Sequence, residues 1–159
     1  MTEFPTKIIM DTGPLLDFLL ASCFKTFPIK HLQYIKNERQ YKNLRDYIFS
    51  TESILLTPYV IAEMNYHVRK IKNKEIISKF WRLALEFLSD DKFQEEIIKI
   101  IEINLQELLE WGITDASLII LGEKTNLSIL TGDSSLWGYY RAKGRSSVFI
   151  NEITEYKIR

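Results

Sequence analysis

The strongest constraint on the fold comes from short apolar segments that alternate along the chain with longer segments of helical character. The apolar segments are residues 8–10, 53–56, 127–130 and 147–150. Short apolar runs of this kind are typical of strands that are buried on both faces of a parallel sheet. Helices between such strands connect them and cover the sheet. The sequence therefore predicts an α/β fold in which helices flank a central parallel sheet.

Helix signals are clear at several positions between these segments. Pro14 is expected at the first position of a helix, and Thr57 and Pro58 as the N-cap and first residue of another that runs to about residue 72. Further helices are expected at residues 75–89, 105–111, 114–124 and 134–142, with a less defined helix within 25–50, whereas residues 96–103 suit either a strand or a helix. Because no linker or repeat interrupts the chain, we expect a single domain over residues 1–159.

Composition excludes several classes of protein. The chain has 159 residues with 21 basic and 21 acidic side chains, and a protein that coats a nucleic-acid duplex would usually be basic. Cys23, His31 and His67 are too few for a typical zinc site. No apolar run approaches the roughly 18 residues needed to cross a bilayer, so we expect a soluble, cytoplasmic protein with no membrane contact.

Two aspartates follow predicted strands directly. Asp11 comes after the strand at residues 8–10, and Asp133 follows the strand at 127–130 after the turn Thr131-Gly132. Each has an ordinary explanation as a helix cap. Strand ends in an open parallel sheet nevertheless lie along one edge, which is where ligands bind. The two aspartates are therefore expected at a shared edge, although the sequence leaves open whether their strands are neighbours.

Two further acids are candidates for the same edge. Glu63 lies within a predicted helix on a largely apolar and aromatic stripe, where a carboxylate needs either a positive partner or an exposed position. Asp115 lies in the first turn of a helix, where the helix dipole alone would stabilise it. Leu118 and Ile119 follow one turn later, which places the Asp115 face toward the core.

Convergence of these four acids would favour a divalent cation, because carboxylates in a partly dry site repel one another strongly. A set of oxygen donors without cysteine or histidine favours Mg²⁺ or Mn²⁺ over Zn²⁺. Such ions orient phosphate groups and neutralise the charge that develops during phosphodiester hydrolysis. The residues therefore predict a site for metal-assisted phosphate chemistry.

Four segments around these acids together resemble the PIN-domain nucleases. The segments are KIIMDTGPLLDFL around Asp11, TPYVIAEMNY around Glu63, GITDASLIILGEK around Asp115 and LSILTGDSSL around Asp133. The resemblance spans nearly the whole chain and implies a three-layer sandwich with a central parallel sheet of about five strands. It also implies that the four acids are the catalytic, metal-binding residues, and that Thr12 and Thr131 support them through hydrogen bonds.

The resemblance further implies an Mg²⁺- or Mn²⁺-dependent endoribonuclease similar to the VapC-type toxins of toxin–antitoxin pairs. Such a protein would cleave RNA, be inhibited by a cognate antitoxin protein and form a homodimer. Two alternatives stay open within this family: a PIN-like RNA- or protein-binding module that does not cleave, and an RNA-processing nuclease that is not a toxin. A receiver-type phosphoacceptor domain is disfavoured, because Thr131-Gly132 stands where such domains place a lysine.

Several other residues have weaker assignments. Arg141, Lys143 and Arg145 follow the last acid closely and are the best candidates for contacts with an RNA backbone, although charge runs usually form solvated surfaces. Residues 25–50 make the stretch between Asp11 and Glu63 long for this family, which suggests a helical insertion in the form of a hairpin. His67 is expected to be a packing or surface residue, and Asp17 an outer acid near Asp11 or a surface residue.

Overall fold

The computed structural model describes residues 3–24, 26–27 and 29–156 and contains a five-stranded parallel sheet. The strands are β1 (Lys7–Met10), β2 (Ser53–Leu56), β3 (Phe93–Glu95), β4 (Ser128–Thr131) and β5 (Ser147–Phe149). Their order across the sheet is β3-β2-β1-β4-β5. From β1 the chain first builds the sheet outward through β2 and β3. It then returns to the other side of β1 to add β4 and β5, which makes the β1–β4 boundary the topological switch point.

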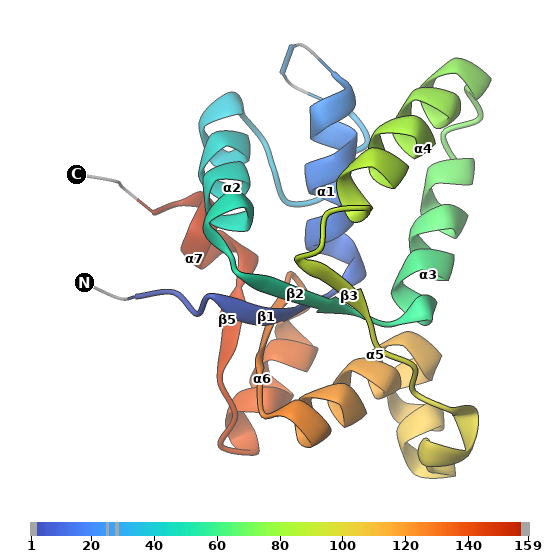
Figure 1. Cartoon of the computed structure of the whole chain (residues 1–159), viewed down its shortest axis with the longest axis vertical. Helices are drawn as coiled ribbons and strands as arrows, with labels where there is room; N and C mark the ends of the chain where they lie inside the picture. Colours follow the sequence, from blue (N-terminus) through green and yellow to red (C-terminus); the bar gives the residue numbers. More distant parts are fainter. Residues whose placement is uncertain (1–2, 25, 28, 157–159) are drawn as a thin grey trace.

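The helices form a layer on each face of this sheet (Figure 1). One layer contains α1 (Thr12–Cys23), α2 (Glu38–Ser50), α3 (Pro58–Arg69) and α4 (Lys74–Leu88), and α7 (Ile150–Thr154) packs on α2. The other layer contains α5 (Leu105–Thr125) and α6 (Ser134–Ala142), with a short 3₁₀ helix, η1 (Ile100–Glu102), before α5. The three-layer α/β architecture and the number of strands predicted from the sequence are confirmed.

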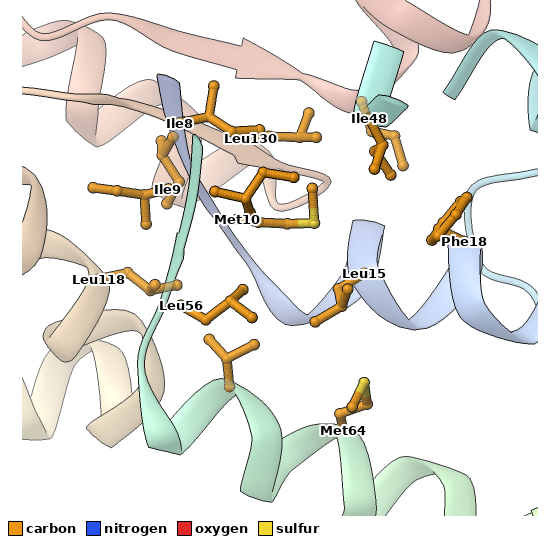
Figure 2. Close-up of a cluster of buried hydrophobic side chains, with 14 of the residues drawn as sticks. Ile8, Ile9, Met10, Leu15, Phe18, Ile48, Leu56, Met64, Leu118 and Leu130 are labelled. Carbon is orange, nitrogen blue, oxygen red and sulfur yellow. The ribbon is translucent and has the colours of Figure 1, made fainter. Parts of the chain in front are cut away.

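Apolar side chains on both faces of the central strands make the core. Ile8, Ile9 and Met10 of β1 are fully buried because helices cover both faces of the strand. Figure 2 shows Ile9 on the side of Leu118 from α5, and Met10 on the side of α1. Burial of side chains of this size contributes about 1.5–3 kcal/mol each to the free energy of unfolding. This two-sided burial explains why the strands are continuously apolar instead of alternating.

Helices α5 and α6 approach each other at Gly122. A Cβ atom at Gly122 would lie 2.8 Å from Cζ of Tyr140, so only glycine leaves room for this ring. Tyr140 is fully buried, and its hydroxyl donates a hydrogen bond of 2.5 Å to the carbonyl oxygen of Leu118. The contact fixes α6 against the helix that carries Asp115.

Several predicted boundaries differ from the structure. Helix α1 begins at Thr12, with Pro14 as its third residue, because the Asp11 carboxylate caps the helix two residues earlier than the proline signal suggested. Proline is tolerated there because the first four N–H groups of a helix have no partner within it. The helices predicted at 105–111 and 114–124 are the two halves of α5, which is bent at Gly112 with φ 74° and ψ 173°.

Three segments depart further from the sequence prediction. Strand β3 lies at Phe93–Glu95, before the ambiguous residues 96–103, and α7 follows β5 without having been predicted. Within the described part of residues 25–50 there is one helix, α2, preceded by irregular chain, so the hairpin expected there is wrong. Residues 25 and 28 of that segment lie outside the described residues.

Among the described residues, no helix combines the length and the apolar character that a membrane span requires.

Candidate functional site

The first two acids lie at the topological switch point of the sheet. Asp11 directly follows β1, and Asp133 follows β4, and these two strands are hydrogen-bonded neighbours. The pairing continues to the end of the strands, since the backbone N–H of Asp11 donates to the carbonyl oxygen of Leu130 at 3.0 Å. The question left open by the sequence, whether the two strands are adjacent, is therefore answered by the sheet order.

Asp11 is held by two hydrogen bonds in a nearly closed environment. Its Oδ1 accepts from the backbone N–H of Thr12 at 2.6 Å, and its Oδ2 accepts from the Thr131 hydroxyl at 2.6 Å. The side chain is only 7% exposed. Burial raises the pKa of Asp11 to about 6, and the nearby charges of Glu63 and Asp133 act in the same direction.

Thr131 joins the two strand-end acids. Besides donating to Asp11, its hydroxyl oxygen accepts from the backbone N–H of Asp133 at 2.9 Å. Asp133 is exposed and caps α6, with its Oδ1 accepting from the N–H groups of Ser135 at 2.7 Å and Leu136 at 3.1 Å. One hydroxyl therefore sets the distance between the ends of β1 and α6, while Asp133 keeps its other carboxylate oxygen outside the cap.

Glu63 reaches the same place from α3. Its Oε2 accepts a hydrogen bond of 2.7 Å from the Thr12 hydroxyl, which belongs to the first residue of α1. Glu63 is therefore linked to Asp11 through the next residue in the chain. The N-terminus of α3 is tied in turn to α5, because the buried hydroxyls of Thr57 and Ser117 lie 2.9 Å apart in a hydrogen bond. These hydroxyl contacts position the two helices that carry Glu63 and Asp115.

Asp115 comes from α5, in the turn that follows the bend at Gly112. The positive φ of Gly112 lets the chain change direction, so that the helix beyond it packs against the sheet. Among the described residues, the Asp115 carboxylate has no hydrogen-bond donor. Burial raises the pKa of Asp115 to about 7, with further contributions from the charges of Asp11, Asp133 and Glu63. Asp115 therefore lies within electrostatic reach of the other three acids.

One cavity contains all four acids, although they are far apart in the sequence. It measures about 160 Å³ and is lined by Asp11, Thr12, Gly13, Leu16, Gln33, Tyr34, Glu63, His67, Asp115 and Asp133. Neither lysine nor arginine is among these lining residues. Without cations of its own, the cavity concentrates negative charge, which adds to burial, the larger cause, in raising the pKa values of Asp11 and Asp115.

The acids share the cavity without converging on a single point. Among the described residues, no three acidic, histidine or cysteine side chains are arranged closely enough to hold a metal ion as they stand. The contacts explain this: Asp11 and Glu63 are turned toward hydroxyl groups, and Asp133 toward its own helix. The donor chemistry still fits Mg²⁺ or Mn²⁺, because the set consists of carboxylate and hydroxyl oxygens. Side-chain rotation would be needed to bring them onto one ion.

The three basic residues that were predicted to contact an RNA backbone lie outside the cavity. The Arg141 guanidinium lies 4.9 Å from the centre of the Trp137 ring, the Lys143 ammonium lies 5.5 Å from that of Tyr139, and Arg145 pairs with Glu123 at 3.4 Å. None of the three basic residues lines the cavity. Helix α6 begins directly after Asp133 and leads away from the acids. Strand β5 runs parallel to β4, so it starts at the end of the sheet that is opposite to the acids.

Sequence reasoning missed the most prominent neutral residue of the cavity, Tyr34, and the role of Asp17. Asp17 is 1% exposed, and its carboxylate accepts from three consecutive backbone N–H groups, those of residues 33–35. It is therefore not a surface residue, and it lies behind the cavity, where it holds the backbone of the lining residues Gln33 and Tyr34. His67 was expected to be a packing or surface residue, and the structure places it in the lining of the cavity. The sequence signal for such a ring is the glycine that comes shortly after each of the two strands, Gly13 and Gly132. Both glycines leave room for the ring of Tyr34.

Comparison of the sequence with protein-family models and with curated proteins found no match to either. The resemblance of the four acid-bearing segments to PIN-domain nucleases therefore stays a prediction.

Proposed function

We propose that this protein is an endoribonuclease of the PIN type that hydrolyses RNA phosphodiester bonds with Mg²⁺ or Mn²⁺. The observation that carries the proposal is the single cavity at the switch point that brings together Asp11, Glu63, Asp115 and Asp133 from four different elements. Four carboxylates with no lysine or arginine among the lining residues repel one another, and this repulsion adds to burial, which is the larger cause, in raising the pKa values of Asp11 and Asp115. A divalent cation relieves that repulsion, which a purely structural cluster would have no need to maintain.

The protein's own groups have separable tasks in this proposal. The four acids would hold the cation, and the cation would neutralise charge on the phosphate and activate a water molecule. Thr131 holds the Asp11 carboxylate and the start of α6 together, while Thr12 holds Glu63 against the end of β1. These hydroxyl contacts hold the elements that carry the carboxylates in place around the cavity, so that side-chain rotation alone would bring the acids onto one ion.

The biological role we propose is that of the toxin in a toxin–antitoxin pair, acting in the cytoplasm as a homodimer that a cognate antitoxin inhibits. Its support is the resemblance of the four segments. Co-expression with the protein encoded by the neighbouring gene tests this role separately from the chemistry. A stable complex that lacks ribonuclease activity is expected. Failure of every neighbouring product to inhibit the enzyme leaves an RNA-processing nuclease as the better description.

The chemistry is tested by incubating the purified protein with mixed RNAs in Mg²⁺, in Mn²⁺ and in EDTA. We expect cleavage that requires the cation and that falls by about 100-fold or more in Asp11→Asn and in Asp133→Asn, as for other groups that support transition-state charge. Asp91→Asn is the matched control, because Asp91 is exposed and lies outside the cavity. Cleavage that persists in EDTA, or in both cavity variants, contradicts the proposal.

A second candidate is a PIN-like module that binds RNA or protein without cleaving. The observation that favours it is the absence, among the described residues, of three ligands already arranged around one point. This candidate predicts binding of RNA by the wild-type protein with no cleavage in either cation, so the same experiment separates the two functions.

A further inference from the structure

Tyr34 forms one wall of the acid cavity, and its ring is in close contact with the backbone of the site. A Cβ atom at Gly132 would lie 2.4 Å from Cε1 and 2.6 Å from Cε2 of Tyr34, which places the ring carbons over this glycine. A Cβ atom at Gly13 would lie 2.6 Å from Cε2 and 3.2 Å from the hydroxyl oxygen. Gly132 precedes Asp133, and Gly13 follows Thr12. The ring therefore lies directly beside both strand-end turns that carry the acids.

The position of Tyr34 is set from within the fold. The buried Asp17 carboxylate of α1 accepts from the N–H groups of Gln33 at 2.9 Å, Tyr34 at 2.6 Å and Ile35 at 3.0 Å. Ile35 is 1% exposed and anchors the same segment in the core. Tyr34 itself is only partly buried, and its hydroxyl has no hydrogen-bond partner among the described residues. The segment is thus fixed, while the ring and its polar tip stay accessible in the cavity.

The charge of the cavity determines how a polyanion could be held there. The lining residues include four acids but no lysine or arginine, so direct ion pairs with RNA phosphates are not available within the cavity. The aromatic and polar groups that remain, besides the acids and Thr12, are the Tyr34 ring, the Gln33 amide and the His67 imidazole. Stacking of a base on an aromatic ring contributes about 1–3 kcal/mol per base and does not depend on phosphate charge. Tyr34 offers the largest such surface.

We propose that Tyr34 is a substrate-positioning residue that stacks on a base beside the phosphate presented to the acids. A base in a duplex is already stacked between its neighbours and cannot reach the ring, whereas bases in loops and single strands can be turned outward. The inference rests on the proposed ribonuclease function and adds the residue that holds the nucleotide next to the scissile phosphate. The residue acts through contact with the substrate and takes no part in bond cleavage.

The test measures RNA binding and cleavage separately. Binding of a short labelled single strand, and of the same strand paired with its complement, is followed by fluorescence anisotropy in the Asp115→Asn background with Mg²⁺. We expect the single strand to bind about tenfold or more tightly than the duplex, and Tyr34→Leu to weaken single-strand binding by about tenfold. In the otherwise wild-type enzyme, Tyr34→Leu should raise KM for single-stranded RNA by a similar factor with kcat changed little, since stacking is present before and during the reaction.

Two further variants separate the ring of Tyr34 from its hydroxyl and from a tyrosine elsewhere. Tyr34→Phe keeps the ring and should bind the single strand to within about twofold of the wild type, whereas Tyr34→Leu is apolar without an aromatic face. Because Tyr34→Phe also keeps the packing on the two glycines, the change in KM at nearly constant kcat is the readout that a merely structural role would not produce. Tyr66→Leu is the matched control, because Tyr66 is 61% exposed on the helix of Glu63 and does not line the cavity. Single-strand binding that is unaffected by Tyr34→Leu, or equal binding of the duplex, overturns the inference.

Failure of this inference can be distinguished from failure of the proposed function. Cleavage by the wild-type protein without dependence on Tyr34 overturns the inference alone. Binding that depends on Tyr34 without any cleavage by the wild-type protein overturns the nuclease proposal and supports the inference. Absence of both binding and cleavage overturns both.

Discussion

At the scale of single residues, the environment of the cavity raises the pKa of Asp115 further than that of Asp11. Asp115 has no hydrogen-bond donor among the described residues, whereas Asp11 has two, and its pKa is the higher of the two, about 7 against about 6. The difference between the two pKa values has a physical cause, because hydrogen-bond donors stabilise the charged form of a carboxyl group and burial destabilises it. The sequence indicated a dipole-stabilised acid at this position. The structure shows instead that desolvation and the neighbouring acids dominate.

The raised pKa of Asp115 predicts how stability depends on pH. The folded state keeps a proton on this carboxyl up to about pH 7, whereas the unfolded chain releases it near the ordinary aspartate pKa of 3.8. Stability therefore falls as the pH rises from about 4 to about 7, and stays low above that. Asp115→Asn removes this loss, so in EDTA at pH 8 the variant should be more stable than the wild type by about 1–3 kcal/mol. The difference should vanish near pH 4.

Urea unfolding across this pH range measures the effect, with Asp91→Asn as the control for loss of one surface carboxylate. An Asp115→Asn variant that is less stable than the wild type at pH 8 would show that the carboxylate is not repelled in the folded protein.

At the scale of elements, the segment before α2 is attached to α1 by a single buried side chain. Asp17 accepts three backbone hydrogen bonds from residues 33–35, and burial raises its pKa above the usual range although these donors oppose the shift. The contact also explains how residues 33–35 are held without forming a helix, since their three N–H groups donate to a side chain outside the segment. Sequence periodicity cannot detect a carboxylate that substitutes for helical hydrogen bonds.

Removal of this anchor should loosen the segment without disrupting the sheet. Asp17→Ala leaves three N–H groups without their acceptor, and we expect a loss of about 2–3 kcal/mol in the free energy of unfolding. Hydrogen exchange at the amides of Gln33, Tyr34 and Ile35 should become faster, while exchange in β1 follows only the global loss of stability. Asp46→Ala is the control, because Asp46 pairs with Arg45 on α2 and does not contact this segment. Unchanged exchange at all three amides would contradict the assignment of Asp17 as the anchor.

At the scale of the whole molecule, the order β3-β2-β1-β4-β5 is what places the acids together. The order makes β1 and β4 neighbours, and the helices that carry Glu63 and Asp115 pack on each other. The cavity is therefore present only in the folded chain, and any ligand that binds the acid set must stabilise folding.

Divalent cations should accordingly raise the unfolding temperature. At about 100 times its dissociation constant, a cation bound only to the folded state adds about 2.7 kcal/mol to the free energy of unfolding, which corresponds to a shift of several degrees in a domain of this size. Mg²⁺ and Mn²⁺ at pH 8 should produce this shift in the wild type and in Asp91→Asn, and a smaller one in Asp11→Asn. Equal shifts in Asp11→Asn and the wild type would place the bound cation outside the cavity. Calorimetry with and without EDTA makes the measurement.

Local order in the chain was sufficient to determine the α/β class, the parallel sheet, most helix positions and the four acids as candidates. These depend on the spacing of apolar residues and on capping signals, both of which act within a few residues. The short strand β3, the helix α7 and the irregular residues 29–37 were not accessible in the same way. Their hydrogen bonds and burial come from partners far along the chain.

What only the tertiary structure decided is the surroundings of the acids. The adjacency of β1 and β4, the hydroxyl contacts of Thr12 and Thr131, and the position of Tyr34 over Gly132 all join residues separated by 51 or more positions, or bring a loop back onto the sheet. Raised pKa values likewise arise from burial and from charges on other elements. Sequence by itself determined which residues could form the site. Long-range packing determined their environment, because desolvation and Coulomb interaction depend on distances that exist only in the folded chain.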